Sequence, residues 1–139
     1  MSAEQNIATI KKAVQAQNAR EFKVFQDLVT PNFVRHELAH IFGDQRGQKE
    51  LGDLMQTMSK VLPDFQNKIE DVFATENRGA VHLSISGTHK GEFLGVAPTG
   101  KKVTFHAITL YRFEEGKIAE VWPLIDVAGF LRQVGALNI

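Results

Sequence analysis

The first part of the chain carries its apolar side chains at the three- and four-residue intervals of a helix. Ile7, Ile10 and Val14 recur at this spacing, and the rhythm continues after Asn18. We expect one long helix, or two helices joined near Asn18. The helical region should end before Pro31, because the residue that precedes a proline disfavours helix.

A further helix is predicted over residues 47–61. Its apolar positions share one face, and they are Leu51, Leu54, Met55, Met58 and Val61. The segment between the two helical regions, residues 30–47, shows no regular period. Its aromatic residues and histidines lie among turn residues, so we expect irregular structure there.

Beyond Pro63 the period changes from that of a helix to that of strands. Residues 79–89 alternate cleanly, with Val81, Leu83 and Ile85 on one side and His82, Ser84 and Ser86 on the other. A long strand is predicted over residues 101–113, a turn at "EEGK", and a returning strand over residues 117–122. A short helix should follow from about residue 127.

Helices followed by a run of antiparallel strands indicate an α+β fold, and nothing divides residues 1–139 into more than one domain. The strand at 103–113 is substantially apolar on both faces, which is unusual for an antiparallel sheet with one face in water. A curved sheet would explain this pattern if one face covered helices and a pocket while the other packed on a second subunit. We therefore predict a homodimer.

Composition narrows the classes of partner. Hydrophobic residues make up 43% of the chain, charged residues 23%, and the 16 Lys and Arg balance the 16 Asp and Glu. This balance predicts no nucleic-acid or membrane partner. The sequence has no cysteine, which excludes disulfides and cysteine-ligated metal sites. The amphipathic N-terminus does not resemble a secretory signal, and no apolar stretch reaches membrane-spanning length, so we expect a cytoplasmic protein.

Three stretches resemble one known family. "GTHKGEFLGVAPTGKKVTF", "YRFEEGKIAEVWPLID" and "GFLRQVG" are similar to the SnoaL-like polyketide cyclases, which are ester cyclases of the NTF2-like superfamily. The resemblance implies a cone-shaped α+β domain, with N-terminal helices on a strongly curved antiparallel sheet and a short C-terminal helix. It also implies ring closure of a polyketide-like ester by intramolecular aldol condensation, without a metal or an organic cofactor.

The resemblance assigns the acid/base role to the aspartate of WxxxD, which is Asp126, and matches the family histidine to His36. We predict that both are catalytic, with His36 as a polar residue of the pocket. Asp126 also has a purely structural interpretation, because Asp is among the best N-caps and a helix is predicted to start at Val127. For catalysis its side chain would face a cavity, where the apolar "WPLI" would desolvate the carboxylate and make it a better base. Asp126 could serve both purposes.

We assign substrate binding to Arg112, His106, Trp122 and Phe33. Arg112 departs from some characterised cyclases and could stabilise an enolate oxygen or bind a carboxylate. If Glu115 and Gly116 centre a two-residue turn, Arg112 and Glu120 fall on opposite faces, and no direct ion pair is predicted.

Residues 36–40, "HELAH", match HExxH by letters. The segment follows loop-like sequence and has no clear third ligand, so we predict no metal.

Two classes of function remain. In the first, an enzyme removes a proton alpha to a carbonyl through Asp126 and closes or isomerises a ring, with an epoxide-hydrolase-like reaction as a neighbouring possibility. In the second, a non-catalytic dimeric domain only binds a small hydrophobic carbonyl ligand, because a fold does not fix a function.

Overall fold

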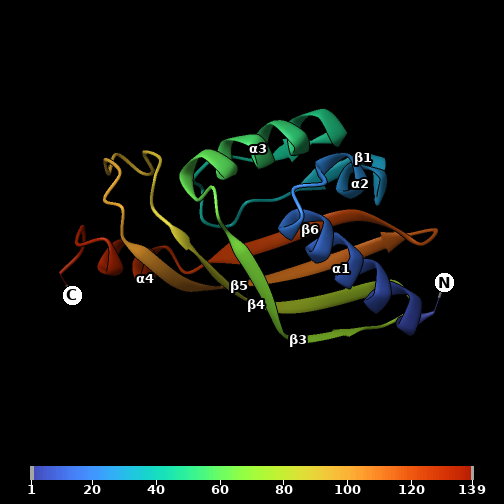
Figure 1. Ribbon diagram of the computed structural model, residues 1–139. Helices are drawn as coiled ribbons and strands as arrows, with labels where there is room; N and C mark the ends of the chain where they lie inside the picture. Colours follow the sequence, from blue (N-terminus) through green and yellow to red (C-terminus); the bar gives the residue numbers. More distant parts are fainter. Residues whose placement is uncertain (1, 139) are drawn as a thin grey trace.

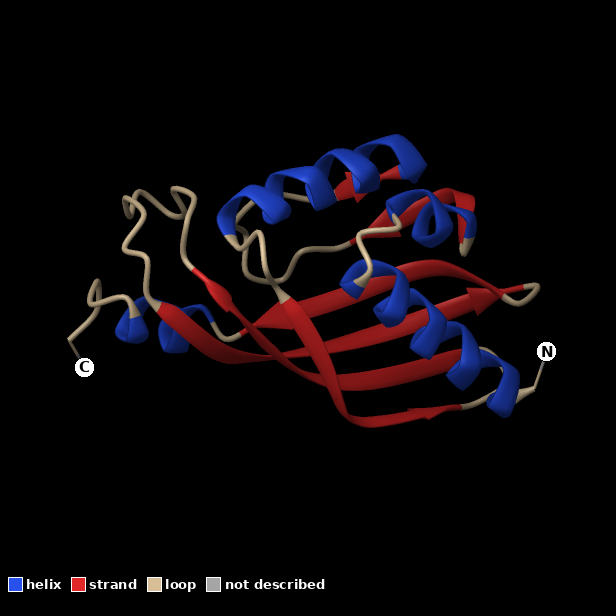
Figure 2. Ribbon diagram, in the orientation of Figure 1, coloured by secondary structure: helices blue, strands red, loops and turns tan. Residues whose placement is uncertain are grey.

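The computed structural model describes residues 2–138, and its centre is one six-stranded sheet with the order β2-β1-β6-β5-β4-β3. Four helices accompany the sheet (Figure 1; Figure 2). In chain order the elements are α1 (Ala3–Asn18), α2 (Phe22–Asp27), β1 (Val29–Arg35), β2 (Gln45–Arg46), α3 (Gly47–Val61), β3 (Gln66–Ala74), β4 (Arg78–Thr88), β5 (Lys102–Glu114), β6 (Lys117–Ile125) and α4 (Val127–Gln133).

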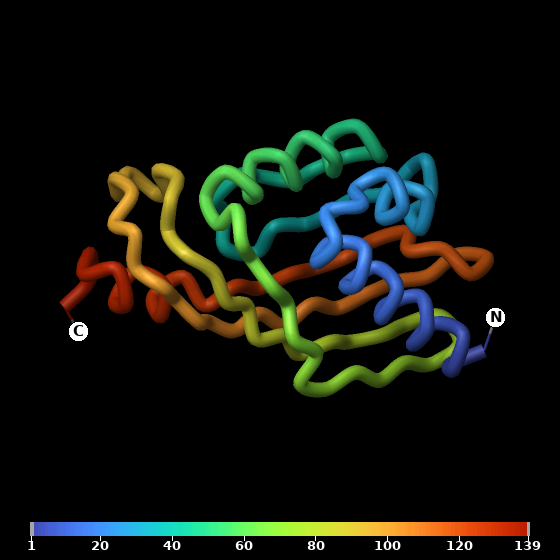
Figure 3. The backbone as a smooth tube through the Cα atoms, viewed as in Figure 1, coloured from blue at the N-terminus to red at the C-terminus, as the bar shows by residue number. Residues whose placement is uncertain are grey.

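The sheet curves, and α1, α2 and α3 lie over one of its faces (Figure 1). The short helix α4 lies at the opposite end of the sheet from the N-terminus, and the backbone trace in Figure 3 shows the two ends of the chain far apart. This arrangement confirms the predicted α+β fold and the short C-terminal helix. All neighbouring strands are antiparallel except β1 and β6, which are parallel.

Two asparagines fasten α1 to the strand beneath it. The fully buried Asn6 donates from Nδ2 to the carbonyl oxygens of Thr75 and Glu76, each at 3.0 Å, at the turn after β3. At the other end of α1, Asn18 donates to the Asn67 carbonyl at 2.9 Å and accepts from its N–H at 2.7 Å. The helix is therefore held at both ends along β3.

The segment predicted to be irregular, residues 30–47, contains most of β1 and all of β2, so that prediction was wrong for residues 30–35 and 45–46. The strand β1 has a proline at position 31, which would normally interrupt a ladder. Its pairing with β6 is irregular between Val29 and Val34, and Pro31 falls within that gap. The proline therefore costs no regular ladder hydrogen bond at this point.

The β5–β6 hairpin has the predicted turn but a different register. Glu115 and Gly116 have φ values of 49° and 80°, which suit a two-residue turn of the primed type. A bulge then leaves Ala119 unpaired, and Arg112 lies directly opposite Glu120. The prediction that Arg112 and Glu120 fall on opposite faces was therefore wrong, and the two side chains form an ion pair that the sequence did not predict. The sequence of the turn does not reveal the extra residue.

Two groups of buried apolar side chains fill the molecule. The larger group lies between the helices and the sheet and includes Ile10, Phe33, Leu51, Met55 and Tyr111. The smaller group surrounds Phe130 of α4 and includes Leu62, Phe93 and Phe105. No helix within residues 2–138 is long and apolar enough to cross a bilayer.

Candidate functional site

A cavity of about 170 Å³ lies between the curved sheet and the helices that cover it. The helix α3 contributes four of its lining side chains: Leu51, Leu54, Met55 and Met58. The inward-facing positions of β5 contribute another four: Phe105, Ala107, Thr109 and Tyr111. The strand β6 adds Val121, Pro123 and Ile125. The walls are therefore mostly apolar, as is usual for pockets that bind small organic molecules.

Five polar side chains interrupt the apolar lining: Gln17, Arg35, Asn67, Thr109 and Tyr111. Burial raises the pKa of the Tyr111 phenol well above its ordinary value, so the hydroxyl stays protonated. A neutral phenol in an apolar cavity can donate a hydrogen bond to a ligand oxygen. Thr109, two residues earlier on the same face of β5, offers a second hydroxyl.

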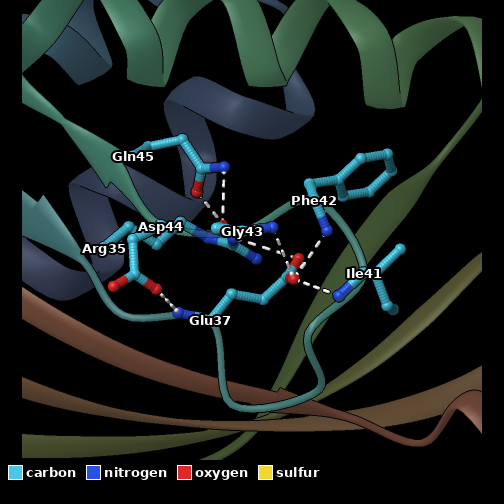
Figure 4. A network of polar contacts seen from close by, with 7 residues as sticks. All are labelled: Arg35, Glu37, Ile41, Phe42, Gly43, Asp44 and Gln45. Carbon is cyan, nitrogen blue, oxygen red and sulfur yellow. Dashed lines mark hydrogen bonds and ion pairs between the residues drawn. The ribbon is translucent and has the colours of Figure 1, made fainter.

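Arg35 is the charged member of the lining, and its side chain is only 12% exposed. Its Nη1 donates to Gln45 Oε1 at 2.9 Å and lies 3.5 Å from Glu37 Oε1 (Figure 4). Burial lowers the pKa of Arg35 and the neighbouring Glu37 opposes that shift. An arginine remains charged under these conditions, so the cavity has a fixed positive charge in its wall.

Glu37 organises the loop between β1 and β2. Its Oε2 accepts from the backbone N–H groups of Ile41, Phe42 and Gly43, with the Phe42 bond at 2.6 Å (Figure 4). Its own N–H donates to Asp44 Oδ1 at 3.0 Å. The carboxylate is 2% exposed, and these bonds explain how a charged group can be buried there.

Apart from Phe33, the residues assigned to the site from the sequence lie outside the cavity lining. Trp122 and Glu120 alternate with the cavity-facing Val121 and Pro123, so they project from the outer face of β6. His36 stacks on Trp122 with ring centroids 5.1 Å apart and contacts Glu120 Oε2 through Nε2 at 2.6 Å. Arg112 contacts the other carboxylate oxygen of Glu120 through Nε at 2.6 Å.

His36, Arg112, Glu120 and Trp122 form an outer cluster in which the Glu120 carboxylate contacts two basic side chains. The hydrogen bond from Arg112, followed by that of His36, holds the pKa of Glu120 below its ordinary value. The pKa of Arg112 is raised, chiefly by the same hydrogen bond. His106 also projects outward, where its Nδ1 lies 3.0 Å from His82 Nε2.

Asp126 caps α4. Its Oδ1 accepts from the Gly129 N–H at 2.9 Å, and its side chain is exposed. Asp126 is therefore the N-cap of α4 in this structure. Its backbone N–H donates to the His106 carbonyl at 2.9 Å, and the preceding residue, Ile125, lines the cavity. The carboxylate thus lies at the end of the cavity-lining strand without itself lining the cavity.

The "HELAH" segment is a loop, so its two histidines do not share the face of a helix. Its glutamate, Glu37, is occupied by backbone N–H groups. Within residues 2–138, no group of three or more His, Cys, Asp or Glu side chains is arranged to hold a metal ion.

Among the residues predicted to bind substrate, Phe33 lines the cavity, and its role in binding stays a prediction. Arg35, Tyr111 and Thr109 were not predicted from the sequence as residues of the site. Tyr111 and Thr109 alternate with outward-facing residues in a strand that was predicted, so their common face could have been found. Arg35 lies on the same face of β1 as Phe33, but this can be inferred from the sequence only if residues 29–35 are known to form a strand.

Comparisons with known proteins agree with the geometry of the fold. The model of a family described as SnoaL-like polyketide cyclase matches residues 8–134. The aklanonic acid methyl ester cyclase AcmA of Streptomyces galilaeus is 28% identical over 135 residues, which cover 94% of this chain and 91% of that protein.

Two solved structures are also similar. AclR from Streptomyces galilaeus has a TM-score of 0.86 and 28% identity, over 99% of this chain and 89% of AclR. IdmH from Streptomyces antibioticus has a TM-score of 0.82 and 27% identity, over 94% of this chain and 99% of IdmH.

Proposed function

Because the chain belongs to the SnoaL-like polyketide cyclase family, we propose that it closes a ring in a small, mostly apolar carbonyl compound. The observation that supports this most directly is the cavity, whose apolar walls are interrupted by a few hydrogen-bonding groups. The similar AcmA is named as a cyclase of a polyketide methyl ester, and we propose a polyketide-like ester here. No cofactor enters the proposed reaction.

The proposed reaction is an intramolecular aldol condensation. The Asp126 carboxylate removes a proton alpha to a carbonyl, and the resulting enolate carbon attacks a second carbonyl of the same molecule. One carbon–carbon bond forms, and the new alkoxide takes up a proton, which Asp126 can return. The cavity hydroxyls of Tyr111 and Thr109 are available to hydrogen-bond the oxygens on which charge develops.

This mechanism makes one demand on the structure. Asp126 must exchange its hydrogen bond to the Gly129 N–H for a position facing the substrate. Its place directly after Ile125, a cavity-lining residue, supports such a movement. Catalytic groups in unliganded structures are often not yet aligned for reaction, so the capping contact is compatible with a catalytic role.

Asp126→Asn is the first test, because asparagine caps helices as well as aspartate but cannot act as a base. Methyl esters of polyketide-like β-dicarbonyl compounds would be incubated with each protein in deuterated water. We expect wild type to exchange the alpha protons and to cyclise the ester. The variant should fold normally and lose turnover by about 10²–10⁴-fold. Unchanged turnover in Asp126→Asn would restrict this residue to capping.

A second candidate is a non-catalytic ligand-binding domain. The exposed, capping position of the Asp126 carboxylate favours it, since none of the cavity-lining residues within 2–138 is then an Asp or a Glu that could act as a base. This candidate predicts that the same esters bind without turnover or alpha-proton exchange, and that Asp126→Asn binds them as wild type does.

We also propose a homodimer formed through the outer face of the sheet. Ile108, Leu110 and Leu124 are 53%, 44% and 52% exposed on that face, which is more apolar surface than a sheet facing water usually presents. Charges of both signs, including Arg78, Arg112, Glu114 and Glu120, flank these side chains on β4, β5 and β6. A two-fold axis through such a mixed surface can bring opposite charges together.

A further inference from the structure

Arg35 has more hydrogen-bond donors than its neighbours use. Its guanidinium has five N–H donors, and within residues 2–138 only Nη1 makes hydrogen bonds, to Gln45 and Glu37. Nε and Nη2 are left with three N–H groups. An unpaired buried donor carries a large desolvation cost, and the cost is greater for a charged group. These donors are therefore free to bind water or a ligand, because the described chain offers them no partner.

The free donors belong to a side chain that lines the cavity and is only 12% exposed. The described side-chain atoms that are fully enclosed and without a partner belong to other residues, namely Asn6, Thr30 and His89. Nε and Nη2 of Arg35 therefore keep some accessible surface, and because Arg35 lines the cavity, a ligand bound there is within reach of this side chain.

The position of the Arg35 guanidinium is fixed by its contacts with Gln45 and Glu37. Gln45 and Glu37 hold Nη1, and Glu37 is itself held by the N–H groups of the 41–43 loop (Figure 4). Glu37 neutralises the positive charge of Arg35 only in part, because its Oε1 lies 3.5 Å from Nη1 while its Oε2 accepts from the N–H groups of the loop. An anion in the cavity would therefore bind to a guanidinium whose donors are already held in position and whose positive charge is only partly neutralised.

From these contacts we propose that Arg35 is the anion-binding group of the cavity, and that its ligand presents two oxygens of one planar anion to Nε and Nη2. Both a carboxylate and the enolate of a β-dicarbonyl have this chemistry. The rest of the ligand is apolar. The cavity of about 170 Å³ is close to the ~150 Å³ engineered cavity that binds benzene, so one ring fits inside it. A longer ligand extends beyond the cavity.

This inference rests on the proposed function in one respect, namely that the ligand binds in the cavity, and it does not require turnover. It assigns to Arg35 the anion-binding role that the sequence analysis gave to Arg112. In the structure, Arg112 lies on the outer face, outside the cavity lining, and its Nε donates to Glu120.

The test is a calorimetric titration of wild type and variants with three probes of similar size. Benzoate represents a carboxylate, benzoylacetone in mild base represents an enolate, and benzamide is the neutral control. Arg35→Gln should weaken the binding of the anions by about tenfold or more and leave benzamide affinity unchanged. Arg35→Lys keeps the positive charge but loses the planar guanidinium, so its affinity for the anions should lie between those of wild type and Arg35→Gln. The exposed Arg46→Gln is the matched control.

Each result bears on the proposal. A loss for benzoate alone identifies the ligand as a carboxylate, and a loss for benzoylacetone identifies it as an enolate. Equal loss for the anions and benzamide would overturn the proposal, because Arg35 would then only shape the cavity. Absence of anion binding by wild type, or loss in Arg112→Gln instead, would also overturn it. Should Arg35→Gln unfold, the Arg35→Lys series decides. Anion binding through Arg35 without ester turnover would refute the cyclase and leave this inference standing.

Discussion

Glu120 connects two basic groups on the outer face of the sheet. One carboxylate oxygen contacts Arg112 and the other contacts His36, each at 2.6 Å. The side chains of Glu120, His36 and Arg112 are 25%, 29% and 34% exposed, so water screens their interactions in part. His36 also stacks on Trp122, so this cluster places polar groups on the same face as the exposed apolar residues.

Glu120→Gln should lower the free energy of unfolding by about 1 kcal/mol at neutral pH, the upper end for a partly exposed ion pair. The pKa of Glu120 is lowered in the folded protein, so its contribution is present above the unfolded pKa and is lost as pH falls through the folded pKa. The difference between wild type and variant should therefore shrink in acid. Urea denaturation at neutral and acidic pH measures it.

Glu114→Gln is the matched control for that experiment. Glu114 also contacts Arg112, at 3.4 Å, but its side chain is 57% exposed. We expect a smaller effect with little pH dependence. An equal loss in both variants, or a difference that persists in acid, would contradict the role given to Glu120.

At the scale of elements, α1 depends on its two asparagine contacts with β3. Asn6→Ala removes two hydrogen bonds from a fully buried side chain, and the carbonyl oxygens of Thr75 and Glu76 lose their donor. We expect a loss of about 1–3 kcal/mol in the free energy of unfolding. Amide hydrogen exchange should also accelerate at the turn between β3 and β4.

The exposed Lys11→Ala, in the middle of the same helix, controls for a general change in α1. It should leave both the stability and the exchange at the turn close to wild type. If Asn6→Ala were equally neutral, the contact with the turn would not be what holds the helix there.

Element by element, the sequence predicts what local periodicity determines. The helix at residues 47–61 was predicted with its observed bounds, and the long strands were recognised from alternation. The strand β1 was missed because its proline resembles a loop signal, and its pairing with distant β6 cannot be seen locally. The bulge at Ala119 was missed for the same reason, since only the partner strand reveals an extra residue.

The site was harder to predict than the fold. Of the residues assigned to the site from the sequence, His36, His106, Arg112 and Trp122 project from the outer face. A motif does not specify which face of a strand its residues occupy. Alternation supplies that information, and from Phe105 onward it would have placed Ala107, Thr109 and Tyr111 on the cavity side.

At the scale of the whole molecule, the outer face predicts association. Leu110→Glu places a charge among Ile108, Leu124 and Trp122, and we expect the variant to be monomeric where wild type is dimeric. Light scattering after size-exclusion chromatography measures the mass in solution. Leu94→Glu is the control, because Leu94 is 43% exposed but lies in the loop before β5. A monomeric wild type, or a dimeric Leu110→Glu, would refute this interface.

The methionines of α3 give the cavity a chemical vulnerability. The chain has no cysteine and three methionines, and two of these, Met55 and Met58, line the cavity. Peroxide would therefore act on sulfur within the ligand-binding space. Conversion to the sulfoxide would make an apolar wall polar and would be reversible by methionine sulfoxide reductases. A bound ligand should shield both thioethers, so their oxidation rate, followed by mass spectrometry, would report whether the cavity is occupied.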